Sequence, residues 1–191
     1  MRRRCGWLLA VLWMVGVGGS LAEAALERMC PTEQRADYVG RAVSVGEKLP
    51  NSSLFLPHEG RAARIRDLSK GSLTLLVFWS PTCPECLEEI KALPKLRDRF
   101  SEDQLSILSI TPAYDDGEMR AKHGDELWNA VKAGLDSTLA CVDDYGSATL
   151  EYKVDEVPYL VLLDGQNVCK TWVVGNTSVE DLVRVIERQL P

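Results

Sequence analysis

Histidine is scarce in this chain, and its scarcity narrows the chemistry that the protein can perform. Only His58 and His123 occur among 191 residues. Three of the six cysteines, Cys30, Cys141 and Cys169, are single and scattered along the sequence. A structural zinc site needs four converging ligands, mostly cysteine and histidine. We therefore expect no zinc or copper site, and no other cofactor.

Excess positive charge is also lacking. The chain has 22 Lys and Arg against 28 Asp and Glu, which gives a formal net charge of −6, and its body carries no basic stripe. Nucleic acids and anionic lipids are bound by basic surfaces, so neither is an expected partner. The apolar fraction of 46% and the length fit one globular domain with a short extension.

The N-terminus differs in character from the rest of the chain. Arginines at 2–4 precede an apolar run at 6–17, and small residues follow through Ala22-Glu23-Ala24. This order is typical of a secretory signal peptide that is cleaved after Ala24. An uncleaved membrane anchor is the alternative, because 6–22 is almost long enough to span a bilayer. We expect a periplasmic or otherwise exported protein, membrane-anchored if the signal is kept.

Cleavage would leave an acidic chain with an odd number of cysteines. It removes three arginines, Glu23 and Cys5, so the net charge changes from −6 to −8 and five cysteines remain. In an oxidising compartment this count fits up to two disulfides and one free thiol. The predicted units are a signal peptide at 1–24, an N-terminal arm at 25–44 and a globular domain at 45–191.

Two of the remaining cysteines, Cys83 and Cys86, form a close pair. The apolar run at 73–78 predicts a strand before them, and 87–100 predicts a helix after them. A helix N-terminus stabilises a thiolate through unpaired N–H groups and the helix dipole. The pattern therefore indicates a redox-active dithiol, with a purely structural disulfide as the alternative.

The rest of the sequence alternates between strand and helix patterns. The continuous apolar run at 105–111 is typical of a strand buried on both faces. We predict an α/β three-layer sandwich with a mixed central sheet flanked by helices, preceded by an N-terminal extension and a hairpin. The other predicted strands are 54–56, 62–65, 139–142, 159–163 and 168–174, and the other predicted helices are 115–132 (ended by Gly134), 147–152 (Ser147 as N-cap) and 178–189.

Pro158 lies directly before the predicted strand at 159–163. Proline is poorly tolerated inside a central strand, so Pro158 should occupy the loop that enters it. Periodicity alone leaves open whether this is an ordinary trans proline at the start of a strand.

Several of these features together resemble the thioredoxin superfamily. They are Trp-Ser-Pro-Thr-Cys-Pro-Glu-Cys at 79–86, Val157-Pro158 about seventy residues later, and the hairpin that follows. The segments 45–50 and 66–71 also resemble the leader of exported TlpA-like thiol-disulfide oxidoreductases of the cytochrome-c-maturation type. The likeness covers about residues 45–190 and implies a thioredoxin-like fold.

The resemblance implies roles for the two cysteines and for several residues around them. Cys83 would be the exposed attacking thiolate, and Cys86 would resolve the mixed disulfide. Pro158 would be a cis proline facing the pair, and the Val157 backbone would hold an extended substrate segment. Glu89 would share a helix face with Cys86 and tune both thiol pKa values.

Further residues of the motif bear on substrate contact and on the direction of electron transfer. Trp79 would serve as a packing platform and a wall of the site, and Pro84 and Glu85 would face the substrate. Val77 replaces the buried aspartate that thioredoxin carries six positions before its first cysteine. An acidic Glu85 beside Cys83 should oppose the thiolate. The histidine that strong oxidants often carry between the thiols is absent, which favours a reductant.

Cys30, Cys141 and Cys169 lie outside the motif. The N-terminal arm could bring Cys30 to Cys169 on the last strand, so we predict a structural disulfide between them. Cys141 is expected to be a small buried core residue. Other pairings stay open, because a sequence does not give connectivity.

The resemblance implies an enzyme that exchanges thiols and disulfides with exported proteins. Its partners would be protein thiols or disulfides and a membrane or soluble redox donor, and we expect a monomer. Two other functions stay open: a thiol peroxidase, suggested by Pro81-Thr82-Cys83, and a binding module that keeps the fold without turnover.

Overall fold

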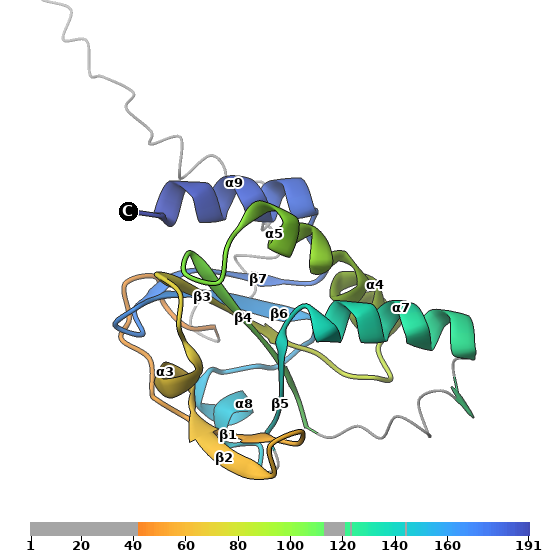
Figure 1. Ribbon diagram of the computed structural model, residues 1–191. Helices are drawn as coiled ribbons and strands as arrows, with labels where there is room; N and C mark the ends of the chain where they lie inside the picture. Colours follow the sequence, from red (N-terminus) through yellow and green to blue (C-terminus); the bar gives the residue numbers. More distant parts are fainter. Residues whose placement is uncertain (1–41, 113–120, 123, 144) are drawn as a thin grey trace, which may run out of the picture.

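The computed structural model describes residues 42–112, 121–122, 124–143 and 145–191. These residues form a sheet of seven strands with helices packed against it (Figure 1). The strand order is β2-β1-β5-β4-β3-β6-β7. The strands are β1 (Ser53–Leu56), β2 (Arg61–Arg64), β3 (Leu73–Phe78), β4 (Leu105–Thr111), β5 (Leu139–Val142), β6 (Tyr159–Asp164) and β7 (Cys169–Val174).

The sheet is mixed, as predicted. β3 pairs in parallel with β4, and β4 with β5. β6 is antiparallel to β3, β7 to β6, and β1 to both β2 and β5. Every residue of β3 and β4 is buried, which explains their continuous apolar sequences, because strands covered on both faces need no polar face.

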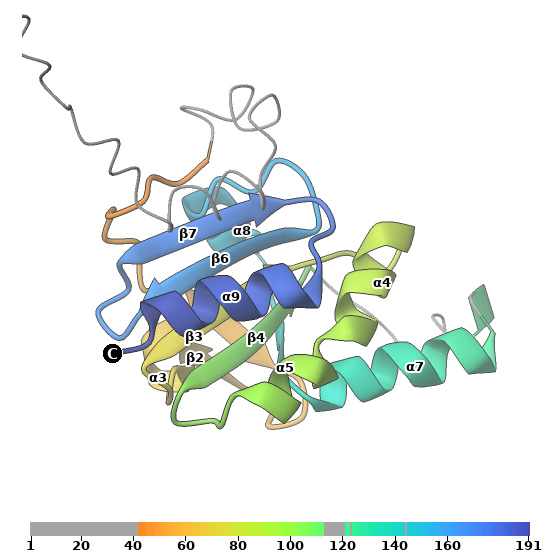
Figure 2. The same cartoon turned by 90° about the horizontal axis from the view of Figure 1, so that it is seen from above.

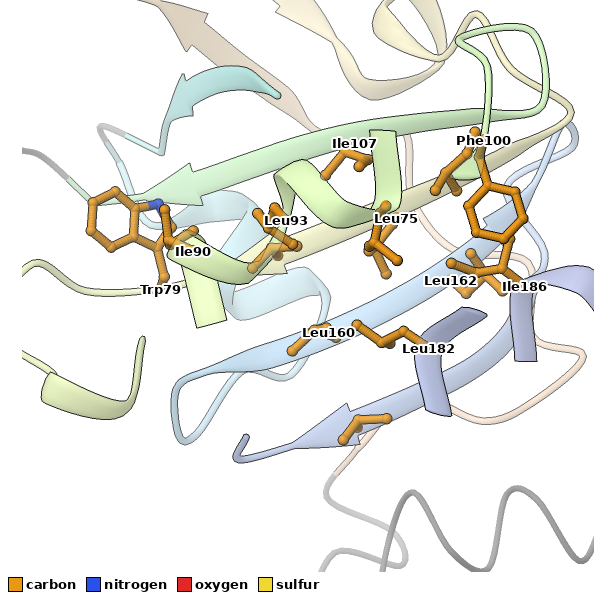
Figure 3. Packing of buried hydrophobic residues seen from close by; sticks show 14 of the residues in the cluster. Leu75, Trp79, Ile90, Leu93, Phe100, Ile107, Leu160, Leu162, Leu182 and Ile186 are labelled. Atoms are coloured by element: carbon orange, nitrogen blue, oxygen red, sulfur yellow. The ribbon is translucent and has the colours of Figure 1, made fainter. Parts of the chain in front are cut away.

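The helices are unequally divided between the two faces of the sheet. Helices α4, α5, α7 and α9 cover one face (Figure 2), and a hydrophobic core fills the space between them and the strands (Figure 3). The short helices α3 and α8 and the segment 42–50 cover the other face. The predicted three-layer α/β architecture is confirmed. The helices are α3 (Ile65–Leu68), α4 (Pro84–Ala92), α5 (Pro94–Arg99), α7 (Asp125–Asp136), α8 (Ser147–Glu151) and α9 (Val179–Gln189).

The helix predicted at 87–100 is in fact two helices, α4 and α5, which meet at Leu93 and Pro94. Proline has no N–H and cannot donate to the carbonyl four residues earlier, here that of Ile90. The Leu93 N–H donates to Ile90 O instead, at 3.2 Å. The sequence prediction missed this break, and it also placed the start of α4 three residues too late.

Gly134 does not end a helix, so that prediction is wrong. α7 continues through Gly134 to Asp136. A Cβ atom at position 134 would lie 2.1 Å from the Ile90 carbonyl oxygen of α4. The glycine therefore permits α7 to cross closely over the helix that begins at the cysteine pair. Part of the helix predicted at 115–132 lies outside the described residues.

The N-cap predicted for α8 is also different. Ser147 is the first helical residue, and Gly146 occupies the cap position without a side-chain hydrogen bond. The buried Asp143 carboxylate accepts hydrogen bonds from the N–H groups of Ala148, at 3.2 Å, and Thr149, at 2.8 Å. A carboxylate from the preceding loop thus satisfies the free donors of the first turn.

The N-terminal part of the described chain extends the sheet and covers its far edge. The predicted hairpin is present as β1 and β2, and the short helix α3 follows it. The segment 42–50 runs along β7: the Gly46 N–H donates to Cys169 O, at 2.8 Å, and the Cys169 N–H donates to Glu47 O, at 2.9 Å.

The predicted signal peptide and most of the predicted arm lie outside the described residues, so their boundaries stay predictions. Among the residues that are described, no helix has the length and apolar character needed to cross a membrane.

Candidate functional site

The two cysteines lie where the central strand β3 leads into α4. Cys83 occupies the N-cap position of the helix. It is joined to Cys86 by a disulfide, with the two Cα atoms 5.2 Å apart. The Cys86 N–H donates to Cys83 Sγ at 3.2 Å. Sulfur thus takes the capping place that an oxygen commonly fills, at the positive end of the helix dipole.

The two sulfur-bearing residues differ in exposure. Cys83 is partly exposed, whereas Cys86 is fully buried, at 0% exposure. An attacking thiol must meet its substrate, while a resolving thiol needs to reach only its neighbour. The difference in exposure therefore suits Cys83 as the attacking thiol and Cys86 as the resolving thiol. Pro84 and Glu85, between them, are both exposed.

The loop before β6 reaches the cysteine pair because β6 is the antiparallel neighbour of β3. The register places Tyr159, at the start of β6, opposite Phe78, at the end of β3. The Val157–Pro158 peptide bond is cis, as the resemblance implies. Cys83 Sγ lies 3.6 Å from the Val157 carbonyl oxygen, so a reduced Cys83 thiol can donate to that carbonyl.

Glu89 is a buried carboxyl group on the same helix. Its side chain is 3% exposed, and the Thr177 N–H, just before α9, donates to Glu89 Oε2 at 3.2 Å. Burial disfavours the charged form and raises the pKa of Glu89 from 4.5 to about 7, although the hydrogen bond from Thr177 opposes this shift. The group can therefore take up or release a proton near neutral pH, one helical turn after Cys86.

Trp79 packs into the core and also borders the site. It is 1% exposed, and its ring lies beside Ile90 at one end of the core (Figure 3). Its backbone N–H donates to Ile110 O at 2.9 Å, which continues the β3–β4 ladder past the end of the strand. The position agrees with the expected packing platform.

A groove of about 320 Å³ is lined by Trp79 and by the loop that precedes Pro158. It reaches the dithiol through Val157, whose carbonyl oxygen contacts Cys83 Sγ. Its walls are mostly apolar and come from four separate parts of the chain. The sequence prediction missed it, because only folding brings these parts together. The lining residues are Phe78, Trp79, Ser80, Ile110, Thr111, Pro112, Gly146, Thr149, Val154, Asp155, Glu156 and Val157.

The structure describes two further cysteines, Cys141 on β5 and Cys169 on β7. Both are buried, and neither forms a disulfide with another cysteine in the described part of the chain. Burial is the main reason that the pKa of each is raised from 9.0 to about 12. Cys141 is thus a buried core residue, as predicted. Cys30 lies outside the described residues, so the Cys30–Cys169 disulfide stays a prediction.

Comparison with known proteins places this geometry in a family. A family model described as the AhpC/TSA family matches residues 45–180. Methylamine utilization protein MauD of Methylorubrum extorquens is 28% identical over 188 residues, which cover 93% of this chain and 82% of that protein. Sporulation thiol-disulfide oxidoreductase A of Bacillus subtilis is 22% identical over 142 residues, covering 74% of this chain and 83% of the relative.

A solved structure shows the same fold. A putative thiol:disulfide interchange protein DsbE from Chlorobium tepidum superposes with a TM-score of 0.60 at 17% sequence identity. The match covers 77% of this chain and 98% of that structure. The thioredoxin-like fold implied by the sequence is therefore confirmed.

Proposed function

The chain belongs to the AhpC/TSA family, and from this premise we propose that it is an exported thiol-disulfide oxidoreductase that reduces disulfides of other proteins. The observation that carries the proposal is the Cys83–Cys86 disulfide at the N-terminus of α4, with its outer sulfur partly exposed beside the Val157 carbonyl. A relative named as a thiol-disulfide oxidoreductase supports the same class.

The proposed exchange moves two electrons from the dithiol to the substrate. The Cys83 thiolate attacks one sulfur of a substrate disulfide, forms a mixed disulfide and releases the other substrate sulfur as a thiolate. Cys86 then loses its proton and attacks Cys83 Sγ, which closes the Cys83–Cys86 disulfide and releases the second substrate thiolate. Both substrate thiolates take up protons. A membrane or soluble dithiol donor reduces the pair again by the same steps in reverse.

The loop at Val157 and Pro158 has a positioning role in this proposal. Its backbone lies in contact with the outer sulfur, at 3.6 Å from Val157 O to Cys83 Sγ. An extended substrate segment that hydrogen-bonds to this backbone would hold its disulfide in front of Cys83. The exposed Pro84 and Glu85 would border the same segment.

Glu89 supplies the proton step of the proposal. Cys86 is fully buried, so its proton needs an acceptor inside the protein when it attacks. Glu89, with a pKa raised to about 7 by burial, is the buried carboxyl group one turn further along the helix. The aspartate that thioredoxin uses has no counterpart here, because position 77 is a fully buried valine.

The proposed direction is reduction. Potentials of related dithiols run from about −270 to about −120 mV, a span of on the order of 7 kcal/mol for a two-electron couple. No histidine lies between the two thiols, where strong oxidants often carry one. We place the protein toward the reducing end, as a monomer that acts on exported protein disulfides.

A thiol peroxidase is the competing function, suggested by the sequence Pro81-Thr82-Cys83. The Thr82 hydroxyl, however, is hydrogen-bonded to Ser80 Oγ at 2.9 Å, and the threonine adjoins Cys83 instead of standing three positions before it. A resolving thiol in the same helical turn also favours disulfide exchange over accumulation of a sulfenate.

Trapping with Cys86→Ser tests the proposal. The variant keeps the attacking thiol but cannot release the mixed disulfide, so it should accumulate mixed disulfides with exported proteins on a non-reducing gel. A Cys83→Ser variant is the matched control and should trap none. Rapid peroxide consumption with a sulfenate at Cys83 would instead establish the peroxidase. If neither mixed disulfides nor peroxide consumption is observed, the protein is a binding module.

A further inference from the structure

Three acidic residues lie within two positions of Cys83 or Val157, the two residues whose atoms meet at the outer sulfur. Asp155 and Glu156 directly precede Val157, and Glu85 lies two residues after Cys83. All three side chains are exposed. None of them forms an ion pair with any residue that the structure describes, in contrast to several carboxylates elsewhere on the surface.

Two lysines close to these carboxylates in the sequence are occupied with other groups. Lys153 Nζ lies 4.0 Å from Glu47 Oε2, and Lys91 Nζ lies 2.6 Å from Glu88 Oε1. The 3.6 Å contact between Cys83 Sγ and the Val157 carbonyl oxygen brings the two acidic segments of the chain together at the outer sulfur. A substrate that approaches this sulfur therefore enters a negative field.

Such a field does not help the attacking thiol, because neighbouring negative charges oppose formation of a thiolate. The same charges do favour the approach of a positively charged partner, and they disfavour a negatively charged one. Exposed carboxylates at the rim of a site thus contribute to partner choice more than to the chemistry.

Asp155 and Glu156 also line the apolar groove. With a volume of about 320 Å³, it is at the small end of ligand pockets and suits one or two side chains. Two large apolar residues adjoin groove residues in the sequence and are exposed: Tyr145, next to Gly146, at 95% and Leu150, next to Thr149, at 80%. Large exposed apolar groups beside a groove mark a surface that binds another molecule.

We propose that this surface selects extended protein segments in which the reacting cysteine is flanked by a bulky apolar residue and by Lys or Arg. The apolar side chain fills the groove, and the basic side chain meets Asp155 and Glu156. The inference rests on the proposed function, because it names the substrates of the same dithiol. It adds a substrate preference, called here the rule of specificity, that does not follow from the dithiol alone.

Reduction of short peptides by the reduced protein tests the rule. Each peptide carries one cysteine in a mixed disulfide with 2-mercaptoethanol, flanked by Leu or Ser on one side and by Arg or Glu on the other. Second-order rate constants are measured by quenched-flow chromatography at low and at high salt. The neutral reagent 2-hydroxyethyl disulfide reports the activity of the dithiol without peptide recognition.

The expected result is a charge preference that salt removes. At low salt the Arg peptides should react about tenfold faster than the Glu peptides, and near 1 M salt, where screening acts within about 3 Å, the ratio should fall to about twofold. The Leu peptides should react about fivefold faster than the Ser peptides, independent of salt.

Two double variants locate the origin of the charge preference. Asp155→Asn with Glu156→Gln should lower the Arg-to-Glu ratio to about threefold or less. The matched control, Glu102→Gln with Asp103→Asn, removes the same charge from an exposed pair before β4, at the opposite end of the sheet. The control should leave the ratio unchanged.

Different failures have different meanings. If 2-hydroxyethyl disulfide is reduced but the four peptides react alike, the rule of specificity is wrong and the proposed function stands. If both double variants change the ratio equally, the preference comes from net charge and not from this surface, and the rule is again wrong. If neither the reagent nor any peptide is reduced, the proposed function and the rule fall together.

Discussion

Replacing Glu89 with glutamine should stabilise the oxidised protein at alkaline pH and change little at acid pH. Glutamine has nearly the shape of a protonated glutamate, and its carbonyl oxygen can accept the hydrogen bond from the Thr177 N–H that Glu89 accepts now. The substitution removes only the cost of ionising a buried carboxyl group.

The size of the effect follows from the pKa of Glu89, which burial raises from 4.5 to about 7. Because the folded pKa is above the unfolded one, the unfolded chain releases this proton first. The stabilising contribution of Glu89 is complete below pH 4.5 and is lost as pH rises through 7. Each pKa unit corresponds to about 1.4 kcal/mol, so the loss reaches about 3 kcal/mol near pH 8.

Urea unfolding of the two proteins at several pH values between 4 and 8 provides the assay. The difference in unfolding free energy should rise from near zero at pH 4 to about 3 kcal/mol at pH 8 in favour of Glu89→Gln. Glu88→Gln, one position earlier and exposed, is the matched control and should show no such rise. A pH-independent difference for Glu89→Gln would refute the assignment of a raised pKa.

Three further predictions concern packing, thiols and capping. Gly134→Ala should cost about 1–3 kcal/mol of unfolding free energy, since its Cβ would lie 2.1 Å from a carbonyl oxygen of α4; Gly165→Ala, with its nearest neighbour at 4.0 Å, should cost less than a third of that. In the folded, reduced protein at pH 8, iodoacetamide should modify neither Cys141 nor Cys169, because burial raises both pKa values to about 12. Mass spectrometry measures the modification, and a rate equal to that of an unfolded control would contradict the prediction. Asp143→Ala should cost about 1–2 kcal/mol in urea unfolding through loss of the α8 cap, and an unchanged midpoint would show that the cap contributes nothing.

The sequence predicts the dithiol well because its determinants are local. The apolar run of β3 and the two cysteines adjoin each other, so a strand, a helix N-terminus and a pair of thiols follow from one short stretch. The cis peptide bond before β6 was predicted from the family resemblance and not from periodicity, because the sequence pattern of a proline at the start of a strand is the same for the cis and the trans isomer. Glu89 likewise reads as a solvated helix charge until the fold buries it.

The features that the sequence analysis missed or misread depend on contacts between distant segments. In the sequence, Gly134 indicates the end of a helix. In the structure, a glycine is needed there because the Ile90 carbonyl of the facing helix leaves no room for a Cβ atom. The groove beside Cys83 has walls from four segments, and no pattern within any one of them indicates a cavity. The break at Pro94 is the exception, because a proline inside a helical pattern is a local signal.

Equilibrium titration of the Cys83–Cys86 pair against glutathione tests the central claim most directly. Quenching by alkylation and counting free thiols on the peptide that holds both cysteines gives the fraction reduced at each ratio of glutathione to its disulfide. We predict that both thiols titrate together as a two-electron couple, at a potential below about −200 mV, near the reducing end of the range of such dithiols. A pair that stays reduced at every accessible ratio, or titrates near −120 mV like a strong oxidant, would contradict this prediction.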